Sequence, residues 1–283
     1  MDSSNVVIIG VEGQLGKALA SKFPLSKKLS HKDIDISNWD SLSNLDLSKA
    51  KVIVNAAAYT NVDKCETKEG RVRAWQVNAI GAGMITRLAE INDCTLVHIS
   101  SDYVFDGTLN PHKEDEPFSP LGVYGQTKAA GDITVNMMRE HFIIRTSWVI
   151  GEGKNFVRTM LELANKGIIP SVVSDQTGRP TFTNVLADGI YHLLASGAPY
   201  GTYNLSNEGE QTNWANLARE VFSRTGNGLN VKDVTSVEYF NDNPKAAPRP
   251  LNSTFDLKKI ESTCFKPKDW QESLKEYLDK ESK

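Results

Sequence analysis

Residues 6–16 read VVIIGVEGQLG, and this run sets the architecture expected for the chain. Its first four residues are apolar, which is typical of a strand buried on both faces of a parallel sheet. Glycines follow at 10, 13 and 16, and residues 17–23 have a helical pattern. Glycine permits a tight turn and lets backbone approach a pyrophosphate, which the helix N-terminus stabilises. The run therefore predicts a dinucleotide site with contacts at Gly10, Gly13, Gln14, Leu15 and Gly16.

Short apolar runs alternate with helical patterns through the first half of the chain. Strands are expected near residues 28–30, 51–54, 96–99 and 142–145, and helices at 72–92 and 124–140. This alternation predicts an α/β fold with a doubly wound parallel sheet of the Rossmann type. We expect residues 1–150 to form the dinucleotide-binding domain.

The regular alternation stops after about residue 150. Helical patterns occur at 155–166, 184–195, 214–225 and 270–278, with a strand-like run at 201–206. We expect the chain to return to the sheet at about 184–206. Residues 151–183 and 207–283 are then predicted to form a smaller C-terminal lobe that binds substrate.

The composition argues against several classes of function. The chain has 283 residues, 40% of them hydrophobic, and a net charge of -3, so no basic surface for nucleic acid or anionic membrane is expected. It has no apolar run near the roughly 18 residues of a membrane helix, and its first residues lack a signal-peptide pattern. Three widely spaced cysteines and scattered histidines predict neither a disulfide framework nor a metal site. The expected location is the cytoplasm.

The segment after the predicted second strand bears on the choice of cofactor. An acidic residue at the end of that strand would bind the ribose hydroxyl of NAD. Here Ser30, His31 and Lys32 could instead receive a 2′-phosphate, so NADPH is favoured and NADH stays open. Asp35 and Ile36 are expected beside the adenine.

Small side chains follow the strand predicted at 51–54. Ala56, Ala57 and Ala58 would let backbone lie along the dinucleotide, with Tyr59 completing this wall. These residues join the predicted cofactor site because the carboxyl ends of parallel strands meet at one edge of the sheet.

Tyr124 and Lys128 are four residues apart in a predicted helix, which places both side chains on one face. A lysine ammonium there would favour tyrosinate and make the phenol a better proton donor. The strand at 96–99 leads into Ser100 and Ser101, where a hydroxyl could donate to a substrate carbonyl. With a nicotinamide nearby, these groups are suited to reducing a ketone.

Several longer motifs carry a family resemblance. They read SSDYVFDG at 100–107, SPLGVYGQTK at 119–128, RTSW at 145–148, NFVRTM at 155–160, DQTGRPT at 175–181 and PRPLNS at 248–253. With these motifs the chain resembles the dTDP-4-dehydrorhamnose reductase family, a branch of the extended short-chain dehydrogenases/reductases. The motifs cover nearly the whole chain.

The resemblance implies an activity and roles for the catalytic residues. NADPH would reduce the C4 keto group of dTDP-4-dehydro-L-rhamnose to give dTDP-L-rhamnose. Ser101 would polarise the keto oxygen and Tyr124 would give it a proton. Lys128 would bind the nicotinamide ribose and lower the pKa of the tyrosine.

The resemblance also implies a set of substrate contacts. In addition to Ser101, the expected residues are Asp102, Tyr103, Val104, Trp148, Asn155, Arg179 and Arg249. Val104 and Trp148 are assigned to the sugar. Asn155 and the two arginines are assigned to the diphosphate or the pyrimidine, because an Arg fork suits phosphate oxygens.

The sequence departs from some relatives, which bind magnesium at a dimer interface through an acidic residue of the first helix. Residues 17–19 contain no carboxylate, so no metal is predicted, and the protein could be a monomer or a homodimer.

Other functions remain open. The chain could be another NDP-4-keto-6-deoxyhexose reductase, or a non-catalytic NADP-binding regulatory subunit of the same fold. A 4,6-dehydratase is disfavoured because Tyr103, not an acid, follows Asp102. The exact sugar, the base and the pathway stay undetermined.

Overall fold

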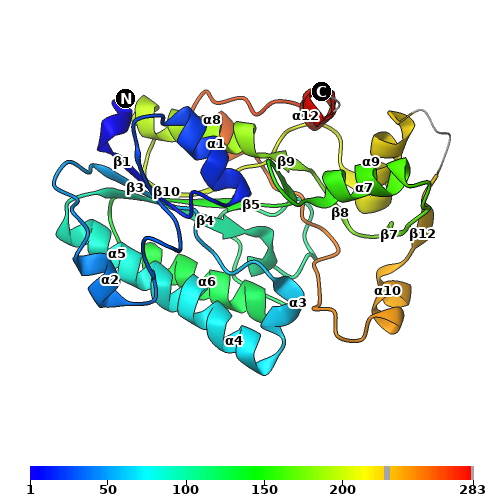
Figure 1. The fold of residues 1–283 in the computed structure, drawn as a ribbon, viewed down its shortest axis with the longest axis horizontal. Coiled ribbons are helices and arrows are strands. Elements are labelled where there is room, and N and C mark those ends of the chain that lie inside the picture. The colour runs from blue at the N-terminus through cyan, green and yellow to red at the C-terminus, as the bar shows by residue number, and fades with distance from the viewer. Residues whose placement is uncertain (226–229, 282–283) are drawn as a thin grey trace.

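A six-stranded parallel sheet forms the centre of the protein in the computed structural model, which describes residues 1–225 and 230–281 (Figure 1). Its strands are β1 (Val6–Ile9), β2 (Lys27–Leu29), β3 (Val52–Asn55), β4 (Thr95–Ser101), β5 (His141–Thr146) and β10 (Gly201–Asn204). All five neighbouring pairs run parallel. The predicted doubly wound α/β fold is confirmed.

The strand order is β10-β5-β4-β3-β1-β2, so the chain changes direction across the sheet between β1 and β3. Ligands of doubly wound sheets bind at such a switch point, beyond the carboxyl ends of the strands. Gly10 follows β1 and Ala56 follows β3, and the Ala56 N–H donates to the Ile9 carbonyl at 2.9 Å. The two predicted dinucleotide segments therefore meet at the switch point.

Helices cover both faces of the sheet because neighbouring strand residues point in opposite directions. Val6 and Ile8 belong to one hydrophobic core, and Val7 and Ile9 belong to another. The first face is covered by α1 (Gln14–Lys22) and α8 (Thr183–Ser196). The second is covered by α2 (Trp39–Ser43), η2 (Trp75–Gly81), α5 (Ala82–Ile91) and α6 (Val123–Val135). Figure 1 shows α2, α5 and α6 together on this side, with α4 (Lys68–Ala74) beside α6.

Two predicted helices have different bounds in the structure. The helix expected at 124–140 ends at Val135, because β5 starts at His141 and the chain must reverse direction between them. The helix expected at 72–92 starts earlier, at Lys68, and includes a π-helical segment at Trp75–Gly81. Hydrophobic periodicity indicates that a helix exists, but tertiary packing decides where it ends.

The C-terminal elements share a third hydrophobic core. It is built by α7 (Phe156–Asn165), α9 (Trp214–Ser223) and α12 (Trp270–Glu281). Three short strand pairs accompany it: β6 (Val149–Ile150) with β9 (Thr181–Phe182), β7 (Ser171–Val173) with β12 (Lys232–Val234), and β8 (Thr177–Gly178) with β11 (Thr212–Asn213). Residues 226–229 and 282–283 of the predicted lobe lie outside the described residues.

The remaining elements are short. They are η1 (Ser3–Asn5), α3 (Val62–Cys65), η3 (Asp102–Val104), α10 (Ser236–Asp242) and α11 (Lys258–Glu261). None of the described helices has the length and apolarity to span a lipid bilayer.

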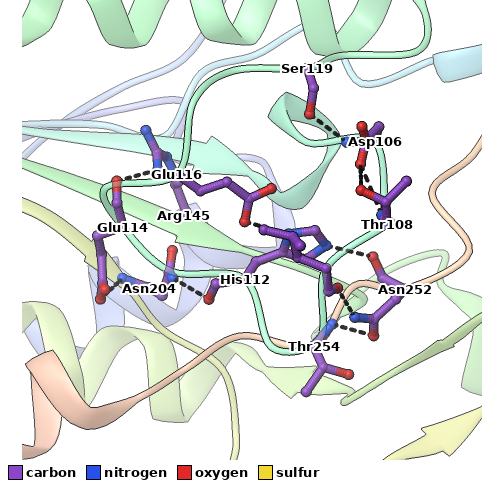
Figure 2. A network of polar contacts seen from close by, with 11 residues as sticks. Asp106, Thr108, His112, Glu114, Glu116, Ser119, Arg145, Asn204, Asn252 and Thr254 are labelled. Carbon is purple, nitrogen blue, oxygen red and sulfur yellow. Dashed lines mark hydrogen bonds and ion pairs between the residues drawn. The ribbon is translucent and has the colours of Figure 1, made fainter.

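A polar network holds the loop between η3 and α6 in place (Figure 2). His112 is fully buried, and its ring nitrogens contact Glu116 Oε2 at 2.8 Å and the Asn252 carbonyl at 3.1 Å. Arg145 Nη1 of β5 donates to the Glu114 carbonyl at 2.9 Å. Asn204 of β10 donates to the His112 carbonyl at 3.1 Å. The network therefore ties the loop before α6 to the sheet and to the segment around Asn252.

Candidate active site

Three cavities follow one another along the carboxyl ends of the strands. The first has a volume of about 420 Å³, the second about 360 Å³ and the third about 250 Å³. The first and second share Gly13, Ala56 and Ala58 in their walls. The second and third share Tyr103 and Trp148. The three volumes therefore form one extended cleft.

The first cavity collects most of the predicted cofactor residues. They are Gly10, Gly13, Ser30, His31, Asp35, Ile36, Ala56, Ala57, Ala58 and Tyr59. Hydrogen bonds from Ser37 and the positive charge of Arg73 lower the pKa of Asp35. Arg73 of α4 also lines this cavity and was not expected from the sequence, because no motif marks it.

The glycine turn brings two backbone segments unusually close. Gly10 has a φ of +88°, and a Cβ there would lie 2.6 Å from the Ala57 nitrogen. At Gly16 a Cβ would lie 2.1 Å from the Gly10 carbonyl oxygen. Both positions exclude a side chain, so the turn leaves a cradle of bare backbone at the start of α1, where a pyrophosphate fits.

Glu12 lines the first cavity and contacts two neighbouring side chains. His31 Nδ1 lies 3.1 Å from Glu12 Oε2, and Lys32 Nζ lies 3.3 Å from Glu12 Oε1. Glu12 thus occupies the two basic side chains that the sequence offered to a 2′-phosphate. His31 lines the cavity together with Arg73.

The second cavity brings the three predicted catalytic side chains together. Ser101 from the end of β4 and Tyr124 and Lys128 from α6 all line it. The predicted cofactor residues Gln14, Leu15 and Gly16 line the same cavity. The glycine turn and the catalytic candidates therefore face one another across a single space.

Lys128 is buried, and its side-chain nitrogen contacts two groups of β4. Its Nζ donates to the Ile99 carbonyl at 2.6 Å and lies 3.4 Å from His98 Nε2. Burial lowers the pKa of Lys128 to about 8, although Asp132 one turn further along α6 acts in the opposite direction.

The expected effect of Lys128 on the tyrosine is wrong for the ligand-free protein. Burial raises the pKa of Tyr124, and the carboxyl group of Asp102 raises it further, while the Ser101 hydroxyl lowers it. The physical reason is that Lys128 is drawn onto the Ile99 carbonyl, so desolvation outweighs any ammonium effect on the phenol.

Asp102 is a buried carboxyl group beside the second cavity. It accepts hydrogen bonds from Ser101 Oγ at 2.9 Å and from Ser253 Oγ at 2.6 Å. Burial raises the pKa of Asp102 to about 6 despite these two donors. In this arrangement the single hydroxyl hydrogen of Ser101 is directed to Asp102.

The third cavity is largely aromatic. Trp148 stacks on Trp214 with ring centroids 3.8 Å apart, and Tyr103 meets Tyr124 edge-on at 5.3 Å. Trp148 has a φ of +47°, a strained conformation for a bulky residue. Trp214 comes from α9 and was missed by the sequence reasoning, because no local pattern connects it to Trp148.

Arg249 reaches the edge of the third cavity from the Pro-rich segment. Its Nη2 pairs with Asp63 Oδ1 at 2.8 Å, and its Nη1 donates to the Ala247 carbonyl at 2.8 Å. The guanidinium therefore fastens this segment to α3 while one edge stays beside the cavity.

Three predicted substrate residues lie elsewhere. Val104 is fully buried in the core under β4, because the tight turn of η3 directs Tyr103 to the cleft and Val104 inward. Asn155 caps α7, accepting from the Arg158 N–H at 3.0 Å, and donates to Tyr277 Oη at 2.9 Å. Neither side chain lines the three cavities of the cleft.

Arg179 is the third predicted substrate residue that lies outside the cleft. Its Nε donates to the Gly209 carbonyl at 2.8 Å and its Nη1 to the Phe255 carbonyl at 3.2 Å. It lines a separate cavity bordered by Glu208 and Glu210. Its guanidinium supports two backbone segments there instead of facing the cleft.

The chain matches a known protein family and several of its members. A family model described as the RmlD substrate binding domain matches residues 4–283. A dTDP-4-dehydrorhamnose reductase from Aggregatibacter actinomycetemcomitans is 35% identical, over 96% of this chain and 97% of the relative. The chain belongs to the dTDP-4-dehydrorhamnose reductase family.

Solved structures of the family have the same fold throughout. A dTDP-4-dehydrorhamnose reductase from Clostridium acetobutylicum is 34% identical, with a TM-score of 0.91 over 98% of this chain and 99% of that chain. One from Bacillus anthracis, in complex with NADP, is 34% identical, with a TM-score of 0.90 over 97% and 98%. The family membership expected from the sequence motifs is confirmed.

Proposed function

We propose that this protein catalyses the NADPH-dependent reduction of dTDP-4-dehydro-L-rhamnose to dTDP-L-rhamnose. The observation that carries the proposal is the second cavity, where Ser101, Tyr124 and Lys128 face the glycine turn. Relatives with the same fold over nearly the whole chain bear the corresponding name, and one of them was crystallised with NADP.

The cofactor fits the first two cavities because the backbone cradle at Gly10 and Gly16 is closed to side chains. The pyrophosphate would lie on the cradle, with the adenine beside Asp35 and Ile36. His31 and Arg73 line this cavity and would be available to a 2′-phosphate. When bound, NADPH supplies the hydride to the C4 carbonyl carbon.

The protein supplies the proton and holds the substrate oxygen. Tyr124 donates its hydroxyl proton to the oxygen as negative charge develops there. Ser101 turns its hydroxyl hydrogen from Asp102 to the same oxygen. Lys128 leaves the Ile99 carbonyl to bind the nicotinamide ribose, which brings its positive charge towards the phenol.

Substrate binding is assigned to the third cavity and the lobe around it. Tyr103 and Trp148 form the wall shared with the catalytic cavity, where the sugar would lie. Trp214 extends this wall, and Arg249, which also lines the third cavity, would bind the diphosphate or the pyrimidine. Residues 151–183 and 207–283 supply much of this half, as the proposed lobe requires.

The test of the proton donor is Tyr124→Phe. Loss of a general acid should lower turnover at least ~10²-fold while NADPH still binds. The measurement is the fall in absorbance of reduced nicotinamide with dTDP-4-dehydro-L-rhamnose. Normal turnover in this variant would remove Tyr124 from its proposed role. No turnover in the wild-type protein, combined with tight NADPH binding, would favour the non-catalytic subunit.

The test of Lys128 is its replacement by Ala. Both NADPH affinity and turnover should fall, because the ribose contact and the positive charge are lost together. Unchanged NADPH affinity would contradict the ribose contact. The wild-type assay repeated with NADH, and with other dTDP-4-keto-6-deoxyhexoses, decides the cofactor preference and the sugar.

A further inference from the structure

A buried chain of hydrogen bonds leads from the cofactor-lining backbone to Lys128. Asn55 ends β3 and His98 lies opposite it on β4, as cross-strand partners in the parallel register. Both side chains are buried, on the α6 side of the sheet. The chain runs from the Ala57 N–H to Asn55 Oδ1 at 3.2 Å, from Asn55 Nδ2 to His98 Nδ1 at 3.1 Å, and from His98 Nε2 to Lys128 Nζ at 3.4 Å.

The direction of this chain follows from its first link. A backbone N–H can only donate, so the Asn55 oxygen must face Ala57 and the Asn55 amide NH₂ must face His98. His98 Nδ1 then accepts. Burial, and the positive charge of Lys128, lower the pKa of His98 well below its ordinary value, so the ring is neutral. A neutral imidazole carries one proton, and here that proton must be on Nε2.

The Nε2–H of His98 therefore points at Lys128 Nζ. Lys128 already donates to the Ile99 carbonyl, which can only accept. A neutral amine has a lone pair and can accept the Nε2–H hydrogen bond, whereas an ammonium has none. The hydrogen bond from His98 to Lys128 Nζ thus favours the amine over the ammonium.

We propose that His98, oriented by Asn55, is a positioning residue that stabilises Lys128 as a neutral amine after Lys128 gives up a proton. Its kinetic consequence rests on the proposed function. When Tyr124 transfers its proton to the substrate oxygen, the resulting tyrosinate must regain one. Lys128 supplies that proton and becomes an amine, and Tyr124 becomes a phenol again. The amine then returns to the position that it has in the ligand-free protein, where it accepts from His98. Solvent then restores the ammonium.

The other charged groups around Lys128 act against or beside this effect. Asp132 on α6 favours the ammonium, but Arg145 of β5 shares the Asp132 carboxylate through an Nε to Oδ2 contact of 3.2 Å. Tyr124 lies one turn before Lys128 on α6, and Asp102 follows β4 at the cavity wall. His98 is the group of β4 that contacts Nζ through a side chain.

The primary test needs no activity. In the ligand-free protein, ¹⁵N NMR of His98 should show the proton on Nε2. A ¹³C NMR titration of the lysine Cε, assigned with Lys128→Arg, should show Lys128 titrating near pH 8. His98→Phe keeps a flat ring but removes the N–H, and should move this titration upward by about one unit, the usual spread of such perturbations. A proton on Nδ1, or an unmoved titration in His98→Phe, overturns the proposal.

Asn55→Asp provides a second variant of nearly the same shape. Its carboxylate would accept from both the Ala57 N–H and His98 Nδ1, which moves the ring proton to Nδ1 and leaves Nε2 as an acceptor for the ammonium. The Lys128 titration should rise by at least ~1 unit. The added charge alone is measured by Asn55→Asp in the His98→Phe background, where the rise should be smaller. Equal rises in both backgrounds contradict the tautomer mechanism.

Kinetics separate this inference from the proposed function. In the wild-type enzyme, the pH profile of turnover should have an alkaline limb that follows the NMR titration, and His98→Phe should move both together. If wild-type turnover is normal but the alkaline limb of its pH profile is unchanged in His98→Phe, the inference is wrong and the proposed function stands. An inactive wild-type protein with the expected titration sinks the proposed function alone.

Discussion

The first cavity takes its shape from backbone, whereas the third cavity takes its shape from side chains. Almost all of the first lining comes from residues 9–36 and 56–59, and a Cβ added at Gly10 or Gly16 would meet backbone atoms. The third is lined by side chains from residues 103 to 253, which belong to the sheet domain, the lobe and the Pro-rich segment. The two ends of one cleft are therefore built by different means.

The first and third cavities should therefore tolerate different kinds of substitution. A backbone cradle is intolerant of any added Cβ but independent of distant packing. A side-chain wall accepts changes of shape but depends on every element that positions it. A dinucleotide has the same structure in every enzyme that uses it, which suits a cavity built from backbone. Nucleotide sugars differ in sugar and base, which suits a cavity built from side chains. The following predictions test this contrast, starting with the largest effect.

Arg145→Met should have the largest effect, because it breaks a buried ion pair. Arg145 pairs with Asp132, and both side chains are buried. Leaving Asp132 unpaired should lower the free energy of unfolding by about 3–5 kcal/mol, as measured by urea denaturation. The control is Arg158→Met, which breaks a more exposed pair with Glu281 and should lose less than ~1 kcal/mol. Similar losses in both variants would contradict the role of the buried network.

Gly16→Ala tests the backbone-built half. Its Cβ would lie 2.1 Å from the Gly10 carbonyl oxygen, so the turn must open, at roughly 1–3 kcal/mol of unfolding free energy. Gly13→Ala is the matched control in the same turn, since its Cβ would lie 3.3 Å from that oxygen. It should be less destabilising and should mainly weaken NADPH binding. If Gly13→Ala unfolds the protein more readily than Gly16→Ala, the cradle is not limited by this contact.

Trp214→Leu tests whether the third cavity serves the nucleotide sugar alone. Loss of the stack on Trp148 should raise KM for the nucleotide sugar up to ~10-fold, since aromatic pairs contribute about 0.5–1.5 kcal/mol beyond their burial. The Kd of NADPH should stay the same. Trp39→Leu is the control and should change neither value, since Trp39 of α2 does not line any of the three cavities. A parallel change in NADPH affinity would show that the two ends are coupled.

Asp102→Asn should have the smallest effect, visible as a change in pH dependence. The pKa of Asp102 is about 6 in the folded protein, against an ordinary value of 3.8. The folded state therefore holds this proton more tightly than the unfolded state, so stability falls as pH rises through this window. The variant lacks this slope, and its stability relative to wild type should increase from pH 3.8 to about 6.

The check on Asp102 is a series of thermal unfolding curves across that pH window. Parallel curves for the variant and the wild type would mean that Asp102 has no raised pKa. Ser253 donates to the ionised Asp102 and lowers its pKa. In Ser253→Ala the stability should therefore fall with rising pH over a wider pH range than in the wild-type protein.

The cofactor half could be read from the sequence because its requirements are local. A buried strand followed by G-x-x-G-x-x-G and a helix leaves few backbone solutions, so residues 6–16 predict the turn and its dinucleotide contacts. The spacing of Tyr124 and Lys128 is also local, since a helix places both on one face whatever surrounds it. The longer motifs added the family, because they extend through the lobe.

Contacts between distant segments were decided only in three dimensions. Trp214 meets Trp148 and Ser253 meets Asp102 across long stretches of chain, and no periodicity connects them. Asn155 and Arg179 bear suitable groups for a diphosphate. In the structure, however, Asn155 caps a helix and Arg179 donates to a backbone carbonyl. A residue type limits the chemistry that a position can perform, but direction, burial and partner depend on long-range packing, which no short window of sequence contains.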